Sequence, residues 1–143
     1  MFLLPIIGRR CQPRVWAAVF RLLCNGWCTQ SRFGGTGPCR FCGAGEDSIR
    51  HLAHCRVVRT QQPLFQAPTS GLQLDTLLGF DGRLGDEQRL VVWAHSVYAL
   101  YRVYNGRRHG RLSLEDVAGA FDEYMRAASR GTAGDGCLRS ERI

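Results

Sequence analysis

The longest periodic pattern in the chain lies in its C-terminal half. It begins after Asp86-Glu87 and ends before Asn105-Gly106, and its apolar residues recur at intervals of three and four. The apolar stripe consists of Leu90, Trp93, Val97, Leu100, Tyr101 and Tyr104. Acidic residues at the start and Asn-Gly at the end are typical helix boundaries. The pattern therefore predicts a helix from Asp86 to Tyr104.

A second helix is predicted directly downstream. Ser113-Leu-Glu-Asp116 has the spacing of a capping box, and Gly131 is a typical stop. Its apolar face consists of Val117, Phe121, Tyr124 and Ala128. Because the connecting loop is short, we expect the two helices to pack as an antiparallel pair. The tail after Arg130 is predicted to be disordered.

The N-terminal half contains one clear helical pattern. Pro13 suits a first helical position and Asn25-Gly26 suits a stop, so a helix is predicted from Pro13 to Cys24. The apolar opening before Arg9 is interrupted by Pro5, and it is too short for a signal peptide or a membrane span. We therefore expect a protein with no membrane partner.

The fold class predicted from these patterns is mainly α. Residues 1–60 are expected to hold an N-terminal helix and a small CCHC zinc knuckle module. Residues 61–85, which include Pro63 and Pro68, are predicted to be an irregular linker. Within it, Leu72 to Phe80 is either a short helix or an extended piece. Residues 86–130 form the helical hairpin, and 131–143 the tail.

Four residues between the helical parts have the spacing of a metal site. Cys39 and Cys42 are followed by His51 and Cys55, in the pattern C-x2-C-x8-H-x3-C. Thiolates and an imidazole at such intervals are typical of structural Zn²⁺. His54 is an alternative third ligand, but His51 shares a helix face with Cys55 whereas His54 would point away. We predict a closed Zn²⁺ site on Cys39, Cys42, His51 and Cys55.

The remaining cysteines indicate the cellular compartment, and the catalytic motifs that are missing argue against an enzyme. The chain has 7 cysteines, and their scatter does not suit a disulfide framework, so a reducing intracellular compartment, nuclear or cytoplasmic, is expected. Cys24 and Cys28 lack further ligands and are predicted to be buried thiols. No catalytic triad, Walker loop, deaminase signature or carboxylate cluster is present, so we expect a non-catalytic protein.

The charge of the chain favours a nucleic-acid partner. The formal net charge is +7, and all 19 basic residues are arginine. Guanidinium groups bind phosphate bidentately, so RNA or DNA is the expected ligand. A GC-rich coding sequence would also explain an all-arginine chain, and arginines near the thiolates can simply neutralise them. The candidate contacts are Arg56, Arg59, Arg102, Arg107, Arg108 and Arg111.

Residues 13 to 60 resemble the zinc-binding domain that follows the reverse transcriptase of non-LTR (LINE-type) retrotransposons. The matching residues are Trp16, the run from Phe20 to Thr29, Arg32, Phe33, Cys39, Cys42, Glu46, Asp47, His51 and Cys55. The interval between the histidine and the last cysteine is one residue shorter than in the family. The polymerase domain that precedes this module there, with its paired aspartates, is not part of the chain.

The resemblance implies that the chain is the tail of an element polyprotein. It also implies binding to template RNA or target DNA, with the reverse transcriptase domain of the same element as a further partner. An alternative of a different class is a zinc-stabilised protein-interaction module. In that case the helix with Trp93, Tyr101 and Tyr104 would pack against a protein partner.

Overall fold

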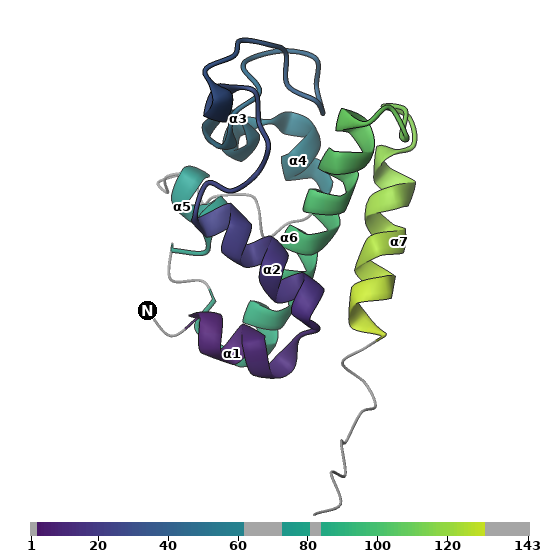
Figure 1. The fold of residues 1–143 in the computed structure, drawn as a ribbon. Coiled ribbons are helices and arrows are strands. Elements are labelled where there is room, and N and C mark those ends of the chain that lie inside the picture. The colour runs from purple at the N-terminus through teal and green to yellow at the C-terminus, as the bar shows by residue number, and fades with distance from the viewer. Residues whose placement is uncertain (1–2, 62–72, 81–83, 131–143) are drawn as a thin grey trace, which may run out of the picture.

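The structure, a computed structural model, describes residues 3–61, 73–80 and 84–130 (Figure 1). Its elements are α1 (Leu3–Arg10), α2 (Pro13–Leu23), a 3-10 helix η1 (Ser31–Phe33), α3 (Ile49–His54), α4 (Arg56–Gln61), α5 (Gln73–Leu78), α6 (Glu87–Arg108) and α7 (Val117–Ser129). The described ranges contain no strand, only an isolated bridge between Pro38 and Glu46. The mainly α prediction is confirmed. The predicted tail and most of the predicted linker lie outside the described residues.

Helix α6 is the element around which the others pack. Every residue from Trp93 to Leu100 is buried, so the helix has no solvent face along this stretch. Helices α1, α2 and α7 cover it (Figure 1). A helix that is buried around its whole circumference lies in the middle of a core rather than at its edge. The predicted hairpin partner, α7, covers only one side of α6, and α1 and α2 cover other parts of it.

The predicted end of α6 at Tyr104 is wrong, because the helix continues through Asn105-Gly106 to Arg108. The Asn105 side-chain amide donates to the carbonyl of Tyr101 at 2.9 Å, which keeps it inside the helix. A Cβ at Gly106 would meet the Leu112 side chain, so this glycine serves close packing. The left-handed residue that ends the turn is Gly110, with φ 66°. The predicted start is right, since the Asp86 carboxylate caps the helix at the Arg89 amide.

Helix α7 runs antiparallel to α6, as predicted (Figure 1). Its capping box is present: the Asp116 amide donates to Ser113 Oγ, and the Ser113 amide donates to Asp116 Oδ2, both at 3.2 Å. The Ser113 hydroxyl also donates to Asp116 Oδ2, at 2.6 Å. This hydrogen bond, then the one from the Ser113 amide, holds the pKa of Asp116 below its usual value. Val117 and Phe121 are buried against α6.

The N-terminal part contains one helix that was predicted and one that was not. Helix α2 begins at Pro13 as expected, and Cys24 is its C-terminal cap. Helix α1 was not predicted, because its apolar run was too short to show a period. Pro5 lies in the first turn of α1, where a missing amide proton costs no hydrogen bond. Ile7 is fully buried and adds α1 to the common core.

The segment after α2 joins the core through aromatic rings. Trp27 is fully buried, and its ring lies 5.3 Å from Tyr101 and 5.6 Å from Tyr104, between centroids. Cys24, in contrast, is exposed and Cys28 is half-buried, so the prediction of buried thiols is wrong for Cys24. It follows a helix end that faces solvent.

None of the helices described above combines the length and the apolar character needed to cross a membrane.

Candidate metal centre

The first two candidate ligands lie in a tight loop closed by backbone hydrogen bonds. The Gly43 amide donates to the Cys39 carbonyl at 3.0 Å, and the Cys39 amide donates to the Gly45 carbonyl at 3.1 Å. The Phe41 amide points at Cys39 Sγ, 3.5 Å away. Amide protons directed at sulfur stabilise the thiolate form that a metal needs. Gly43 and Gly45 have positive φ angles of 68° and 69°, which the loop requires.

The other two ligands lie at the ends of one helical turn. Ser48 caps α3 by accepting the His51 amide proton at 3.1 Å. The helix ends at His54, and Cys55 is its C-terminal cap with an extended backbone. The Cys55 amide still donates to the His51 carbonyl at 2.8 Å. This turn holds the His51 and Cys55 side chains on the same side.

The structure brings the four predicted ligands together. The Sγ atoms of Cys39, Cys42 and Cys55 and a ring nitrogen of His51 all lie within 4.8 Å of one another. The Cys39 and Cys55 sulfur atoms are 4.0 Å apart, and Cys42 Sγ is 3.3 Å from His51 Nε2. A tetrahedral Zn²⁺ with ordinary bond lengths would place such atoms about 3.6–3.8 Å apart. The cluster can therefore hold a metal ion, and its donor set is typical of zinc.

The two candidate histidines differ in position. His54 is exposed and lies outside the cluster. The cluster therefore contains His51, the histidine that the four-residue offset favoured, and its role as a ligand stays a prediction.

The electrostatics of the sulfur atoms suit a cation at the centre. Cys39 and Cys55 are buried and their sulfur atoms form a hydrogen bond. That bond and burial raise the pKa of Cys39, while accepting the same proton lowers the pKa of Cys55. A divalent ion would replace the shared proton and neutralise both thiolates. With four protein ligands, no position would remain for a reactive water molecule.

Gly45 packs directly against the His51 ring, which gives a test of the loop geometry. A Cβ at Gly45 would clash with His51 Cε1 and Nδ1, whereas a Cβ at Gly43 would meet nothing within 4 Å. Both glycines have the left-handed backbone, which costs other residues about 1–2 kcal/mol. We expect Gly45→Ala to weaken zinc affinity at least roughly tenfold beyond Gly43→Ala, because only Gly45→Ala moves a ligand. Competition with a chromogenic chelator measures both; equal effects would contradict the predicted ligand role of His51.

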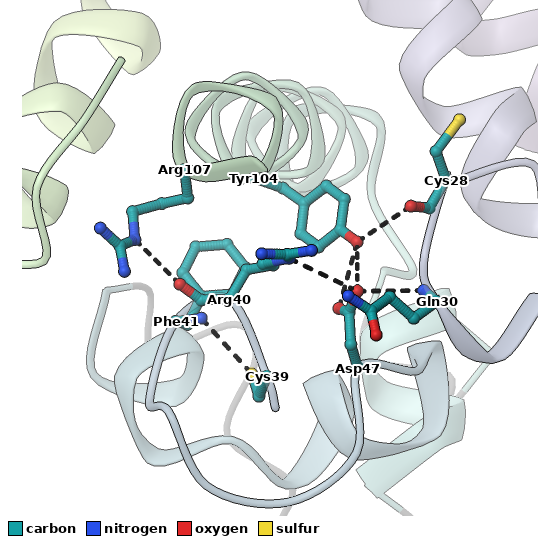
Figure 2. Close-up of polar contacts among 8 residues, drawn as sticks. All are labelled: Cys28, Gln30, Cys39, Arg40, Phe41, Asp47, Tyr104 and Arg107. Carbon is teal, nitrogen blue, oxygen red and sulfur yellow. Dashed lines mark hydrogen bonds and ion pairs between the residues drawn. The ribbon is translucent and has the colours of Figure 1, made fainter. Parts of the chain in front are cut away.

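A buried carboxylate fixes this loop to the long helix. Asp47 is fully buried, and it accepts hydrogen bonds from the Tyr104 hydroxyl at 2.9 Å and from the Gln30 amide at 3.0 Å (Figure 2). Arg40 Nε lies 3.9 Å from the same carboxylate. Burial, then the hydrogen bond to Asp47, raise the pKa of Tyr104, so the phenol keeps the proton that it donates. Asp47 thereby links three parts of the chain.

Sequence reasoning missed this contact. Acidic residues directly before a helix usually face solvent, where they interact favourably with the helix dipole. Glu46 is exposed in this way, but Asp47 turns inward. A signal was present in the stripe of α6, because a tyrosine hydroxyl in a buried position requires an acceptor. The pairing partner, however, lies 57 residues away.

Arg107, a predicted nucleic-acid contact, forms hydrogen bonds with backbone carbonyls of the chain itself. Its Nε donates to the Arg40 carbonyl at 2.9 Å (Figure 2). Its Nη1 donates to the Leu112 carbonyl at 2.8 Å. Arg107 thus connects the Cys39–Cys42 loop with the turn between α6 and α7. Two of its donors are occupied within the chain.

The other predicted arginines lie in two places. Arg102 and Arg111 line a pocket of about 140 Å³ beside the α6–α7 turn, together with His109. Arg108 is exposed in the last turn of α6. Arg56 and Arg59 belong to α4, where Arg56 is exposed and Arg59 is half-buried. No described carboxylate forms an ion pair with Arg56, Arg102, Arg108 or Arg111.

The similarity to the non-LTR retrotransposon domains rests on the residues quoted above and remains a prediction. No family model, no curated protein and no solved structure matches the chain.

Proposed function

We propose that this chain is a non-catalytic, zinc-stabilised module that binds RNA or DNA. The observation that carries the proposal is the pocket at the α6–α7 turn, which is lined by Arg102, Arg111 and His109 and by no described acidic residue. Arg102 donates to the Tyr98 hydroxyl at 3.2 Å, but neither Arg102 nor Arg111 forms an ion pair with a described carboxylate. Guanidinium groups that converge on one concave surface without a carboxylate partner suit phosphate oxygens. The net charge of +7 adds a long-range attraction for a polyanion.

Zinc is the metal that the site suits best. Three sulfur donors and one imidazole form a soft, tetrahedral set that Mg²⁺ and Ca²⁺ do not favour. None of the six cysteines in the described ranges forms a disulfide, and the proposal therefore includes a reducing intracellular compartment. The ion would fix the positions of α3 and the Cys39–Cys42 loop. Because Arg107 binds both this loop and the turn between α6 and α7, the ion would also help to hold that turn in place.

Retroelement origin is part of the proposal. The matching residues include the four candidate metal ligands and Asp47. The Asp47 carboxylate joins the segment that holds these ligands to α6, through its hydrogen bond with Tyr104. A module of this kind would act beside a reverse transcriptase domain of the same element, and hold its RNA or DNA. That partner role rests on the resemblance.

The alternative, a protein-interaction module, receives less support. It expected Trp93, Tyr101 and Tyr104 to contact a partner, but Trp93 and Tyr104 are fully buried in the core of the chain itself. Because these two side chains are buried, they cannot contact a protein partner at the surface of α6.

Binding to labelled RNA and DNA over a salt series tests the proposal. We expect affinity to fall steeply as salt rises, because phosphate contacts release counterions. Arg108→Gln/Arg111→Gln should weaken binding by roughly tenfold or more and lower the logarithmic salt slope by about 1.4–1.8.

The matched control is Arg9→Gln/Arg126→Gln, which removes the same charge from exposed positions on α1 and α7. Equal losses in the two double variants would show attraction by net charge alone. Absence of binding at low salt would refute the proposed function.

A further inference from the structure

A second pocket, distinct from the one at the α6–α7 turn, lies beside the metal-binding end. Its volume is about 320 Å³, at the lower end of the range of about 300–1,000 Å³ for ligand pockets. Its apolar walls come from the end of α2, from α3 and from α5. These residues are Leu22, Leu23, Ile49, Leu74 and Leu78. The two pockets share no described lining residue.

The charged groups at this pocket are both arginines. Arg32 comes from η1 and Arg50 from α3, and both are exposed. The other described polar residues of the lining are uncharged, and no described carboxylate is among them. An apolar floor with two guanidinium groups complements a ligand that joins a flat apolar body to an anion. A nucleotide with an unpaired base has this chemistry.

An exposed aromatic ring adjoins the pocket through Arg32. Phe33 is 68% exposed, more than any other large hydrophobic side chain in the described ranges. The Arg32 guanidinium lies over its ring, 5.4 Å from the centroid. Exposed aromatic rings beside arginines are the platforms on which proteins stack the bases of single strands. Neither Phe33 nor Arg32 is needed for the core.

The metal centre would position one wall of this pocket. Ile49 and Arg50 occupy the first turn of α3, directly before the ligand His51. Ser48, which also lines the pocket, holds the His51 amide through its hydroxyl. We therefore expect metal binding, which would fix the position of α3, to fix the pocket wall formed by Ile49 and Arg50 as well.

We propose that this pocket binds an unpaired nucleotide of single-stranded RNA or DNA. The base enters the apolar pocket, Arg32 and Arg50 contact its phosphates, and Phe33 stacks on the neighbouring base. This inference rests on the proposed function, which it deepens from nucleic acid in general to single strands.

Fluorescence anisotropy of the full zinc-loaded chain tests it, with an oligonucleotide in single-stranded RNA, single-stranded DNA and duplex DNA forms. We expect Phe33→Ala to weaken single-strand binding about 5- to 100-fold and to leave duplex binding unchanged. Arg32→Gln/Arg50→Gln should lower the single-strand salt slope by about 1.4. Comparison of the two single strands identifies which nucleic acid fits the pocket.

Phe80→Ala is the matched control, because Phe80 is 49% exposed and does not line the pocket. If Phe33→Ala binds single strands as the wild type does while Arg108→Gln/Arg111→Gln weakens binding, the inference is overturned and the proposed function stands. If the wild-type chain binds no nucleic acid at low salt, both fail.

Discussion

Replacing Cys42 with serine is expected to remove the metal and to unfold the end of the molecule that holds α3 and α4. Serine is a poor zinc ligand, and the three remaining ligands would leave the sulfur atoms of Cys39 and Cys55 buried without a cation. Structural zinc supplies about 10–16 kcal/mol of binding free energy in zinc-finger peptides. We therefore expect a loss on the order of 5 kcal/mol in the free energy of unfolding. Zinc content by mass spectrometry and helicity by circular dichroism measure the result.

Cys24→Ser is the control for this substitution. Cys24 is exposed and belongs to no ligand cluster of the described residues, so zinc content and stability should stay at the wild-type values. Chelation of the wild-type protein should reproduce the Cys42→Ser spectrum. Wild-type protein purified without chelator that contains no zinc would contradict the proposed site.

The second large effect is expected at the contact between Asp47 and Tyr104. Asp47→Ala removes the acceptor of a buried hydroxyl and of the Gln30 amide, and should destabilise the zinc-loaded protein by about 3 kcal/mol. Tyr104→Phe keeps the ring in the core and should cost about 1–2 kcal/mol. Urea denaturation of the wild type, both single variants and the double variant measures these values.

The double variant decides whether the two groups act as one unit. Because each change removes the same hydrogen bond, we expect a coupling free energy of about 1 kcal/mol or more. Tyr101→Phe is the control, since no described group forms a hydrogen bond with the Tyr101 hydroxyl. Strict additivity of Asp47→Ala and Tyr104→Phe would show that the contact contributes little.

Features encoded by local spacing could be predicted from the sequence. The start of α2 at Pro13 and the capping box before α7 each depend on residues a few positions apart. The four residues of the candidate metal centre lie within one short segment, from Cys39 to Cys55. The end of α6 was missed because Asn-Gly stops a helix only when its glycine is free to take the left-handed conformation. Here Gly106 packs under Leu112.

Contacts between distant segments could not be predicted in the same way. Ile7 carries no periodic signal, yet it is fully buried because α1 packs on α2 and α6. Asp47 sits in a loop whose neighbours are polar and glycine-rich, and nothing nearby indicates burial. Its acceptor role becomes visible only when Tyr104 is placed above it.

The complete burial of the middle of α6 determines which segments of this protein can be cut off or moved by recombination without exposing its core. A cut within residues 61–85 would separate α1 and α2 from the helix that they cover, and would expose its apolar residues to water. A recombination event that moved the cysteine-rich segment alone would leave Tyr104 without Asp47. The smallest transferable piece that keeps the core intact therefore runs from α1 to α7.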